Sequence, residues 1–207
     1  WVEVRPESHR VYPAGAVAAH VMGGVDHDQR GYAGAEKSLN SLLSGQTGQM
    51  VLTVDSKQRG FESEVAVPAQ AGQTVALTID RRIQYLSERA IAEAVKKNHA
   101  DNGSIVVMNP HTGAVLAMAN YPNFDPNATP QGAAEMKARQ NLAVEAPFEP
   151  GSVFKVVTIA AALELGKVTP ETIVDCGMGQ MTLHTRVIRD HVRHGVIPVR
   201  EVLAQSS

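Results

Sequence analysis

Ser152 and Lys155 are the two side chains of this sequence best suited to chemistry. No other serine in the chain has a lysine three residues after it. On a helix, residues three apart share one face, about 5 to 6 Å apart at Cβ, so the lysine amine can reach the serine hydroxyl. A serine becomes a nucleophile when a base takes its proton, and a neutral lysine amine can be that base. The spacing is therefore typical of acyl transfer, with Ser152 as nucleophile and Lys155 as base.

The surroundings of this pair favour the same chemistry. The pair opens an almost wholly apolar run from 152 to 165, which predicts a buried helix that ends at Gly166. Burial and the positive end of the helix dipole both favour a neutral amine in the first turn, and free backbone N–H groups there could face an oxyanion. The alternative interpretation is an ordinary helix start, with Ser152 in the cap and Lys155 extending to water.

Two other sets of side chains could bind or react. His184, His191 and His194 fall within eleven residues, but their spacing fits no helical or finger-like set of metal ligands. A solvated loop is therefore the favoured interpretation, with a metal site as the alternative. The single cysteine, Cys176, has no evident histidine to activate it, and we expect it to serve packing.

Composition excludes several classes of protein. The 207 residues are 43% hydrophobic and 19% charged, so the chain can bury a core and is not a disordered polyelectrolyte. The formal net charge is -2, whereas a general nucleic-acid binder is basic, so we expect no nucleic acid as partner. No apolar run approaches the roughly 18 to 20 residues of a membrane span. One cysteine allows no internal disulfide.

The first seventy or so residues predict short, turn-rich elements. Glycine and proline interrupt this stretch every few residues, leaving room for a short helix around 35–43 and short strands at 51–54 and 64–67. The character changes near Gly72, which predicts a second domain beginning there.

The remainder alternates strands and helices. We expect a strand at 74–79, then a helix capped by Asp80 with apolar residues at three- and four-residue spacing. A hairpin of 104–108 and 114–118 follows, and because both runs are almost wholly apolar we expect both faces to be covered. Further short strands at 173–175 and 181–188 and a helix at 199–205 complete the prediction.

The segment from Glu149 to Lys155 resembles the active-site segment of class B penicillin-binding proteins, the serine D,D-transpeptidases that cross-link peptidoglycan. The resemblance extends in colinear order over nearly the whole chain. It includes Leu77-Thr78-Ile79-Asp80 with Gln84, the hairpin around Asn109-Pro110-His111-Thr112-Gly113 and the loop Tyr121-Pro122-Asn123-Phe124-Asp125-Pro126-Asn127. It also includes two upstream segments, Arg10-Val11-Tyr12-Pro13-Ala14-Gly15 and the stretch from Gly34-Ala35-Glu36 to Gly45-Gln46-Thr47-Gly48.

This resemblance implies an α+β fold in two parts. Residues 1–72 would be part of a β-rich, non-catalytic pedestal or dimerisation domain. Residues 73–207 would be the N-terminal part of a transpeptidase domain with a sheet flanked by helices, similar to serine β-lactamases. Ser206 would be the serine of a second motif, Ser-x-Asn, whose asparagine would come after Ser207, and the third motif, Lys-Thr-Gly, is absent. We therefore expect a fragment that acylates poorly alone and that a second chain or an oligomer could complete.

The resemblance also implies a mechanism and partners. Ser152 would attack the penultimate D-Ala of a stem peptide, Lys155 would accept the proton, and Ser206 would relay a proton to the leaving D-Ala. β-Lactams would acylate the same serine, and no metal or organic cofactor is required. A membrane glycan polymerase or divisome proteins are expected partners. The parent would be a single-pass membrane protein with its catalytic domain outside the cytoplasmic membrane, and the wording around Ser152 leans toward a division or sporulation type.

Two alternatives stay open. The chain could be a non-catalytic cell-wall scaffolding module in which the serine–lysine pair is vestigial. It could also be related to a β-lactam sensor or a β-lactamase, although neither usually carries a pedestal domain.

Overall fold

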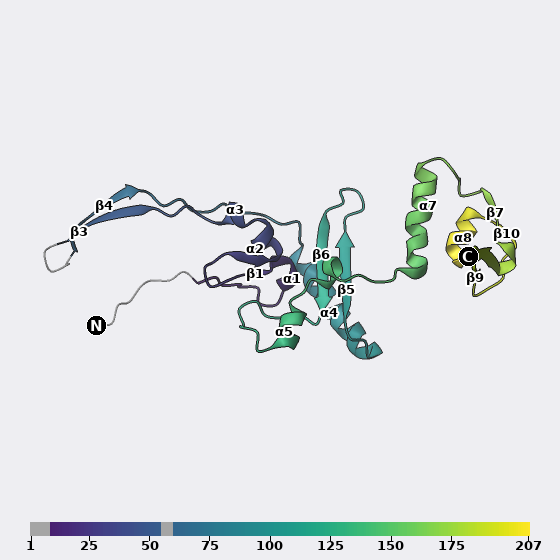
Figure 1. Cartoon of the computed structure of the whole chain (residues 1–207), viewed down its shortest axis with the longest axis horizontal. Coiled ribbons are helices and arrows are strands. Elements are labelled where there is room, and N and C mark those ends of the chain that lie inside the picture. The colour runs from purple at the N-terminus through teal and green to yellow at the C-terminus, as the bar shows by residue number, and fades with distance from the viewer. Residues whose placement is uncertain (1–8, 55–59) are drawn as a thin grey trace. The chain divides into compact units, whose positions relative to one another are not determined.

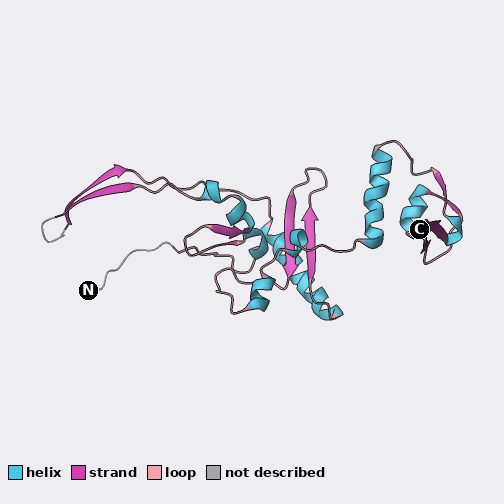
Figure 2. Cartoon of the chain, viewed as in Figure 1, coloured by secondary structure: helices cyan, strands magenta, loops and turns pink. Residues whose placement is uncertain are grey.

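The structure, a computed structural model, describes residues 9–54 and 60–207. It divides into two compact units, Trp1–Ala146 and Pro147–Ser207. Both units mix helices and strands (Figures 1 and 2), so the α+β prediction is confirmed. In the described residues the strands pair two by two, as five antiparallel pairs.

The N-terminal part of the first unit consists of short elements, as the glycines and prolines predict. They are α1 (Ala19–Met22), β1 (Gly24–Val25), β2 (Gly31–Ala33), α2 (Gly34–Ser38), α3 (Asn40–Leu43), β3 (Gln49–Val54) and β4 (Gly60–Val67). Strands β3 and β4 pair as a long ribbon (Figure 2), and the helix predicted around 35–43 is two helices that meet at Leu39.

An ion pair between the exposed Arg10 and the buried Glu36 stabilises this N-terminal part. The side chain of Glu36 is 4% exposed, and its Oε1 accepts a hydrogen bond from Arg10 Nε at 2.8 Å and a second from Nη2. A carboxylate is costly to bury without a partner, so the guanidinium is what permits Glu36 to lie inside. The same hydrogen bonds raise the pKa of Arg10.

Side-chain amides join the segment around Tyr12 to the loop around Asn127, 115 residues away in sequence. Asn127 Oδ1 accepts from Tyr12 N at 2.9 Å, and Asn127 Nδ2 donates to Tyr12 O at 3.0 Å. Asn123 Nδ2 adds a bond to Ala16 O at 3.0 Å. An amide that pairs both ways with a backbone imitates a strand partner, so these hydrogen bonds hold the two segments together.

The second part of the first unit is a helix packed on a hairpin. Helix α4 (Arg81–Asn98) lies against β5 (Gly103–Met108) and β6 (Val115–Tyr121), which pair with Val106 opposite Met118. Asp80 caps the helix as predicted, its Oδ1 accepting from Arg82 N at 2.8 Å and Ile83 N at 3.0 Å. Two short helices follow, α5 (Ala133–Ala138) and α6 (Leu142–Glu145).

Gln84 joins α4 to β6. Its side chain is fully buried, yet each polar atom has a partner: Oε1 accepts from Met118 N at 2.8 Å, and Nε2 donates to Met118 O at 3.0 Å and to Glu88 Oε1 at 2.8 Å. Glu88 Oε1 also accepts from Ala18 N at 2.8 Å, which connects α4 to the start of α1. Because these hydrogen bonds form in only one arrangement, they fix the orientation of α4 relative to β6.

His20 is buried under the loop that follows β6. Its Nε2 donates to Ala138 O at 2.8 Å, and its ring meets Phe124 edge-on with centroids 5.0 Å apart. On the same phenyl ring, the guanidinium carbon of Arg139 lies 4.6 Å from the centroid. Burial lowers the pKa of His20, against smaller opposing effects of the Ala138 carbonyl and two glutamates.

Two predictions for the first unit are wrong. Residues 74–79 form no strand. Thr78 Oγ1 donates to Val115 O at 2.6 Å, and just after the segment Asp80 N donates to Leu116 O at 2.8 Å. The β5–β6 hairpin is not covered on both faces, because Val106 is 46% and Met108 is 53% exposed. Helix α4 covers one face, and within the described part of the first unit the other face has no comparable cover.

The second unit begins with η1 (Gly151–Val153) and α7 (Phe154–Glu164). It continues with β7 (Ile173–Asp175), η2 (Gly177–Gly179), β8 (Gln180–Leu183), β9 (Arg186–Arg189), β10 (Val196–Pro198) and α8 (Val199–Gln205). Strand β7 pairs with β10, and β8 pairs with β9. The predicted end of the apolar helix is confirmed, since Gly166 has a φ of +61° and donates to Leu163 O at 3.0 Å.

The expectation that the apolar helix is buried is wrong for the part of the chain described. Val153 is 71%, Phe154 55% and Val157 57% exposed. Apolar character creates a tendency to be buried, but burial needs a neighbouring surface. In the second unit α7 contacts mainly the preceding turn and α8, which cover only a small part of it.

We predict that Gln84→Met destabilises the chain by about 2 to 3 kcal/mol, because it keeps the size of the side chain and leaves the buried N–H and C=O of Met118 unpaired. The free energy of unfolding from chemical denaturation measures this effect. The matched control is Gln140→Met, at an exposed glutamine, which should change stability by no more than about 0.5 kcal/mol. Equal effects of the two substitutions would contradict the role of Gln84.

We predict that His20 makes the chain less stable in mild acid. Because its pKa is lowered in the folded state, the unfolded chain binds the proton more readily, so this stability is complete above about pH 6.5 and is lost as the pH falls through the folded-state pKa. Unfolding free energies at about pH 7 and about pH 5 should differ less for His20→Gln than for the wild type. His111→Gln, at an exposed turn, is the control and should keep the wild-type difference.

Candidate active site

The short turn η1 and the first turn of α7 position Ser152 and Lys155. Gly151 opens this turn with a φ of +52°, a left-handed conformation that glycine adopts without strain. Val153 N then bonds Pro150 O at 3.2 Å, which closes the turn. Ser152 is exposed and Lys155 is half-buried. The sequence therefore starts the helix at the two residues that could do chemistry.

Lys155 meets Ser206 at the end of α8, 51 residues away in sequence. Its Nζ donates to the backbone carbonyl of Ser206 and lies 3.3 Å from Ser206 Oγ. Ser206 is in the left-handed conformation, with φ 58° and ψ 35°, which turns the chain sharply after the helix. Lys155 Nζ is thus held between a carbonyl and a hydroxyl, a geometry in which a proton can pass between the lysine and the serine.

Helix α8 is fixed in the second unit by the segment before β7. Val199 N donates to Thr172 O at 2.9 Å and Arg200 N to Pro170 O at 3.1 Å, so two of the free N–H groups of the first turn have partners. Arg200 Nη1 also lies 3.3 Å from Glu171 Oε1, an exposed ion pair that adds little. These contacts hold the helix whose last turn carries Ser206.

Of the three predicted site residues, the structure brings Lys155 and Ser206 together. Ser152 lies one turn before Lys155, and within the described residues no hydrogen bond joins Ser152 Oγ to Lys155 Nζ. Ser152 is exposed in the short turn η1, which precedes α7. A substrate carbonyl could approach it there.

Sequence reasoning gave no role to Asp190, which the structure places beside this site. Asp190 Oδ2 accepts a hydrogen bond from Ser207 Oγ at 2.6 Å, and Ser207 follows Ser206 directly. Seventeen residues separate the two partners, and no spacing rule predicts a contact across such a loop. Only the folded arrangement of β9 and α8 shows it.

The described residues contain no candidate metal site and no candidate membrane span. Across residues 9–54 and 60–207, no three His, Cys, Asp or Glu side chains come close enough to hold a metal ion. No helix in these ranges is both long and apolar enough to cross a bilayer.

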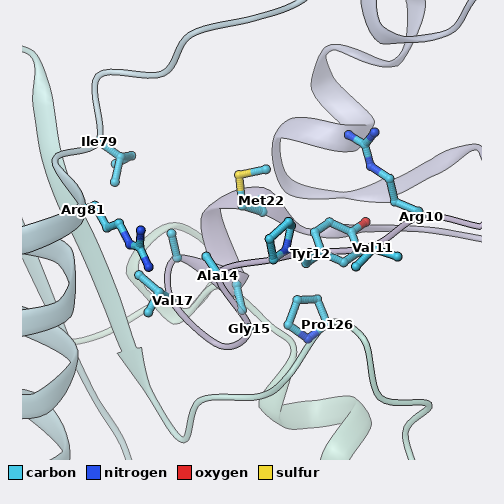
Figure 3. A pocket seen from close by; sticks show the side chains of 13 residues that line it. Arg10, Val11, Tyr12, Ala14, Gly15, Val17, Met22, Ile79, Arg81 and Pro126 are labelled. Carbon is cyan, nitrogen blue, oxygen red and sulfur yellow. The ribbon is translucent and has the colours of Figure 1, made fainter.

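A mainly apolar cavity of about 380 Å³ lies in the first unit (Figure 3), between Tyr12, Met22, Ile79 and Pro126. None of the three predicted site residues lines it.

Comparison with protein families divides the chain in two. Residues 2–77 match the penicillin-binding protein dimerisation domain. Residues 103–207 match the penicillin binding protein transpeptidase domain. Helix α4 lies between the two matched ranges.

Curated relatives span the chain. It is 35% identical to the peptidoglycan D,D-transpeptidase FtsI of Escherichia coli K12 over 209 residues, which are 100% of this chain and 34% of that protein. It is 40% identical to the penicillin-binding protein PbpB of Mycolicibacterium smegmatis over 199 residues, which are 91% of this chain and 29% of that protein. The chain thus spans about a third of the length of the relatives it matches.

Solved structures agree with these relatives. Penicillin binding protein 3 of Mycobacterium tuberculosis, in complex with ampicillin, superimposes with a TM-score of 0.75 at 34% identity and covers 96% of this chain and 41% of that one. A peptidoglycan synthetase from Bifidobacterium adolescentis gives a TM-score of 0.77 at 28% identity, covering 96% and 36%. The resemblance of the sequence to this family is therefore confirmed, and the chain belongs to the class B penicillin-binding proteins, with a dimerisation domain followed by a transpeptidase domain.

Proposed function

We propose that this chain is the part of a peptidoglycan D,D-transpeptidase that carries the nucleophile. The observation that supports this most directly is the contact of Lys155 with Ser206. Two residues that the sequence suggests as parts of separate motifs meet across 51 positions, one turn from Ser152. The names of the relatives from Escherichia coli and Pseudomonas aeruginosa, both peptidoglycan D,D-transpeptidases, support the same reaction.

In this proposal, Ser152 Oγ attacks the carbonyl carbon of the penultimate D-Ala of a stem peptide while its proton passes to the neutral amine of Lys155. The negative charge that develops on the carbonyl oxygen is stabilised by backbone N–H groups. The intermediate then breaks its C–N bond, and the leaving D-Ala nitrogen takes a proton from Lys155 by way of Ser206 Oγ. The product of this half-reaction is an ester between Ser152 and the shortened stem peptide.

The second half-reaction reverses the proton path. An amine from a neighbouring stem peptide attacks the ester carbon and loses a proton to Lys155. The C–O bond to Ser152 breaks, and the serine oxygen takes a proton back. The new amide is the cross-link, and no redox change or additional reactant is needed.

We also propose β-lactams as ligands of the same serine. The solved structures of the Mycobacterium tuberculosis protein include complexes with ampicillin and with aztreonam. The strained amide carbon would take the place of the D-Ala carbonyl, and the ring nitrogen would stay attached after the bond opens. The resulting ester would persist because the acceptor amine is excluded.

We propose a domain boundary near residue 72, with the pedestal domain in 1–72 and the transpeptidase part in 73–207. The family matches end at 77 and begin again at 103, which leaves α4 without an assignment. The bonds of Gln84 with β6 support placing α4 with the transpeptidase part. The substrate would place the enzyme outside the cytoplasmic membrane, where a glycan polymerase and divisome proteins would be its partners.

We predict that Ser152→Ala abolishes covalent labelling of the full-length protein by fluorescent penicillin, because no other hydroxyl takes its place at the start of α7. Gel fluorescence and intact mass measure the adduct. Thr158→Ala is the control: it removes another exposed hydroxyl from the same helix, one that bonds Phe154 O, and should keep labelling. Undiminished labelling of Ser152→Ala would exclude it as the nucleophile.

We predict that Lys155→Arg lowers the acylation rate of the full-length protein by about 100-fold or more, the usual size of a general-base effect. Arginine keeps the positive charge and can still donate to Ser206, but it does not release its proton in proteins. A stopped-flow rate with a chromogenic β-lactam tests this. A rate within threefold of wild type would show that charge, and not proton transfer, is the contribution of Lys155.

A further inference from the structure

The side chain of Asp190 makes one contact that the mechanism above does not use. Asp190 follows β9, and its Oδ2 accepts the hydrogen bond from Ser207 Oγ at 2.6 Å. Its backbone N–H is used separately, donating to Gly179 O at 2.9 Å. Backbone hydrogen bonds therefore close the hairpin β8–β9, and the Asp190 carboxylate is free to bind Ser207 at the end of α8.

The contact of Ser207 with Asp190 helps to hold the backbone conformation at the end of α8. Ser206 has a left-handed backbone, which is uncommon for a residue with a side chain and persists where neighbouring contacts hold it. Ser207 N bonds Val202 O at 3.0 Å, which closes the helix end through the backbone. Among the described residues, the bond from Ser207 Oγ to Asp190 is the side-chain hydrogen bond that ties this end to the β8–β9 hairpin.

The orientation of Ser206 decides what Lys155 meets. Lys155 Nζ donates to both the carbonyl oxygen and the Oγ of Ser206. This carbonyl belongs to the peptide between Ser206 and Ser207, so a rotation of that peptide moves the carbonyl away from the amine. Ser207 is the residue on the far side of that peptide. A charge-assisted bond of its hydroxyl to a carboxylate is short and directional, and it restrains the rotation.

We propose that Asp190 is a positioning residue for acyl transfer: through Ser207 it holds Ser206 in the orientation that exchanges a proton with Lys155. This inference rests on the proposed function, because it assigns Asp190 to the same site. The carboxylate contacts neither substrate nor Lys155 in this role, and its effect is on the rate of the chemical step.

The test uses the full-length protein and a chromogenic β-lactam. Asp190→Ala, Ser207→Ala and the double variant are compared by stopped flow, which separates the dissociation constant of the initial complex from the acylation rate constant. We expect each single variant to lower the rate constant about tenfold, the loss of one hydrogen bond to a charged group, with the dissociation constant within twofold. We expect the double variant to be no slower than either single one, since both remove the same bond.

Two further variants separate positioning from folding. Ser207→Thr keeps a hydroxyl that can bond Asp190 and should restore most of the acylation rate. Asp175→Ala removes another carboxylate of the same unit, which accepts from Gly177 N at 2.9 Å, and should acylate like the wild type. Melting temperatures should agree among all variants.

Several results would overturn the inference. Wild-type acylation by Asp190→Ala would do so, as would additive losses in the double variant, or a lower melting temperature with rate and binding reduced together. Ser152→Ala in the same series separates this failure from that of the proposed function. If Ser152→Ala still forms the adduct, the acyl-transfer proposal fails; if it does not and Asp190→Ala is unaffected, only the role of Asp190 fails.

Discussion

The contact between Lys155 and Ser206 is the interaction on which the candidate site depends. One partner lies in the first turn of an apolar helix and the other just after the last turn of a short helix 51 residues later. Neither helix alone places an amine beside a hydroxyl. Strands β7 and β10 lie between them in sequence, and pairing of these strands returns the chain so that α8 meets α7.

In the first unit, buried polar side chains join segments that are distant in sequence. Gln84, Glu36 and His20 are all buried, and each has a hydrogen-bond partner in another segment. Leaving such a group unpaired in the interior costs free energy, so each pair selects one arrangement of helix, strand and loop. Apolar contacts are less selective because they have no direction. Polar pairs therefore explain why short, glycine-broken segments hold a defined geometry.

Some apolar segments of this chain are exposed, although their composition favours burial. Helix α7 is apolar around most of its circumference, yet Phe154, Val156 and Val157 are exposed, and so are Val106 and Met108 on the hairpin. The hydrophobic effect rewards removal of such surface from water, but only a neighbouring element can remove it. Within the described residues, these apolar side chains therefore remain in contact with solvent.

Local chemistry determined much of this protein in advance. The sequence by itself was enough to predict the cap at Asp80, the helix end at Gly166, the hairpin around Gly113 and helix α8, because each depends on neighbours within about four residues. It also carried the family resemblance. It misjudged residues 74–79 and the burial of α7, because strand pairing and burial depend on partners elsewhere in the chain.

Only the tertiary structure decided which distant residues meet. The sequence suggested Ser206 as a site residue through the family resemblance. Its contact with Lys155, however, depends on the pairing of β7 with β10, which lie between the two residues in sequence. The contact of Asp190 with Ser207, and that of Gln84 with Met118, left no trace in spacing or composition. Hydrogen bonds between side chains far apart in sequence depend on the path of the whole chain, and periodicity reports only the local part of that path.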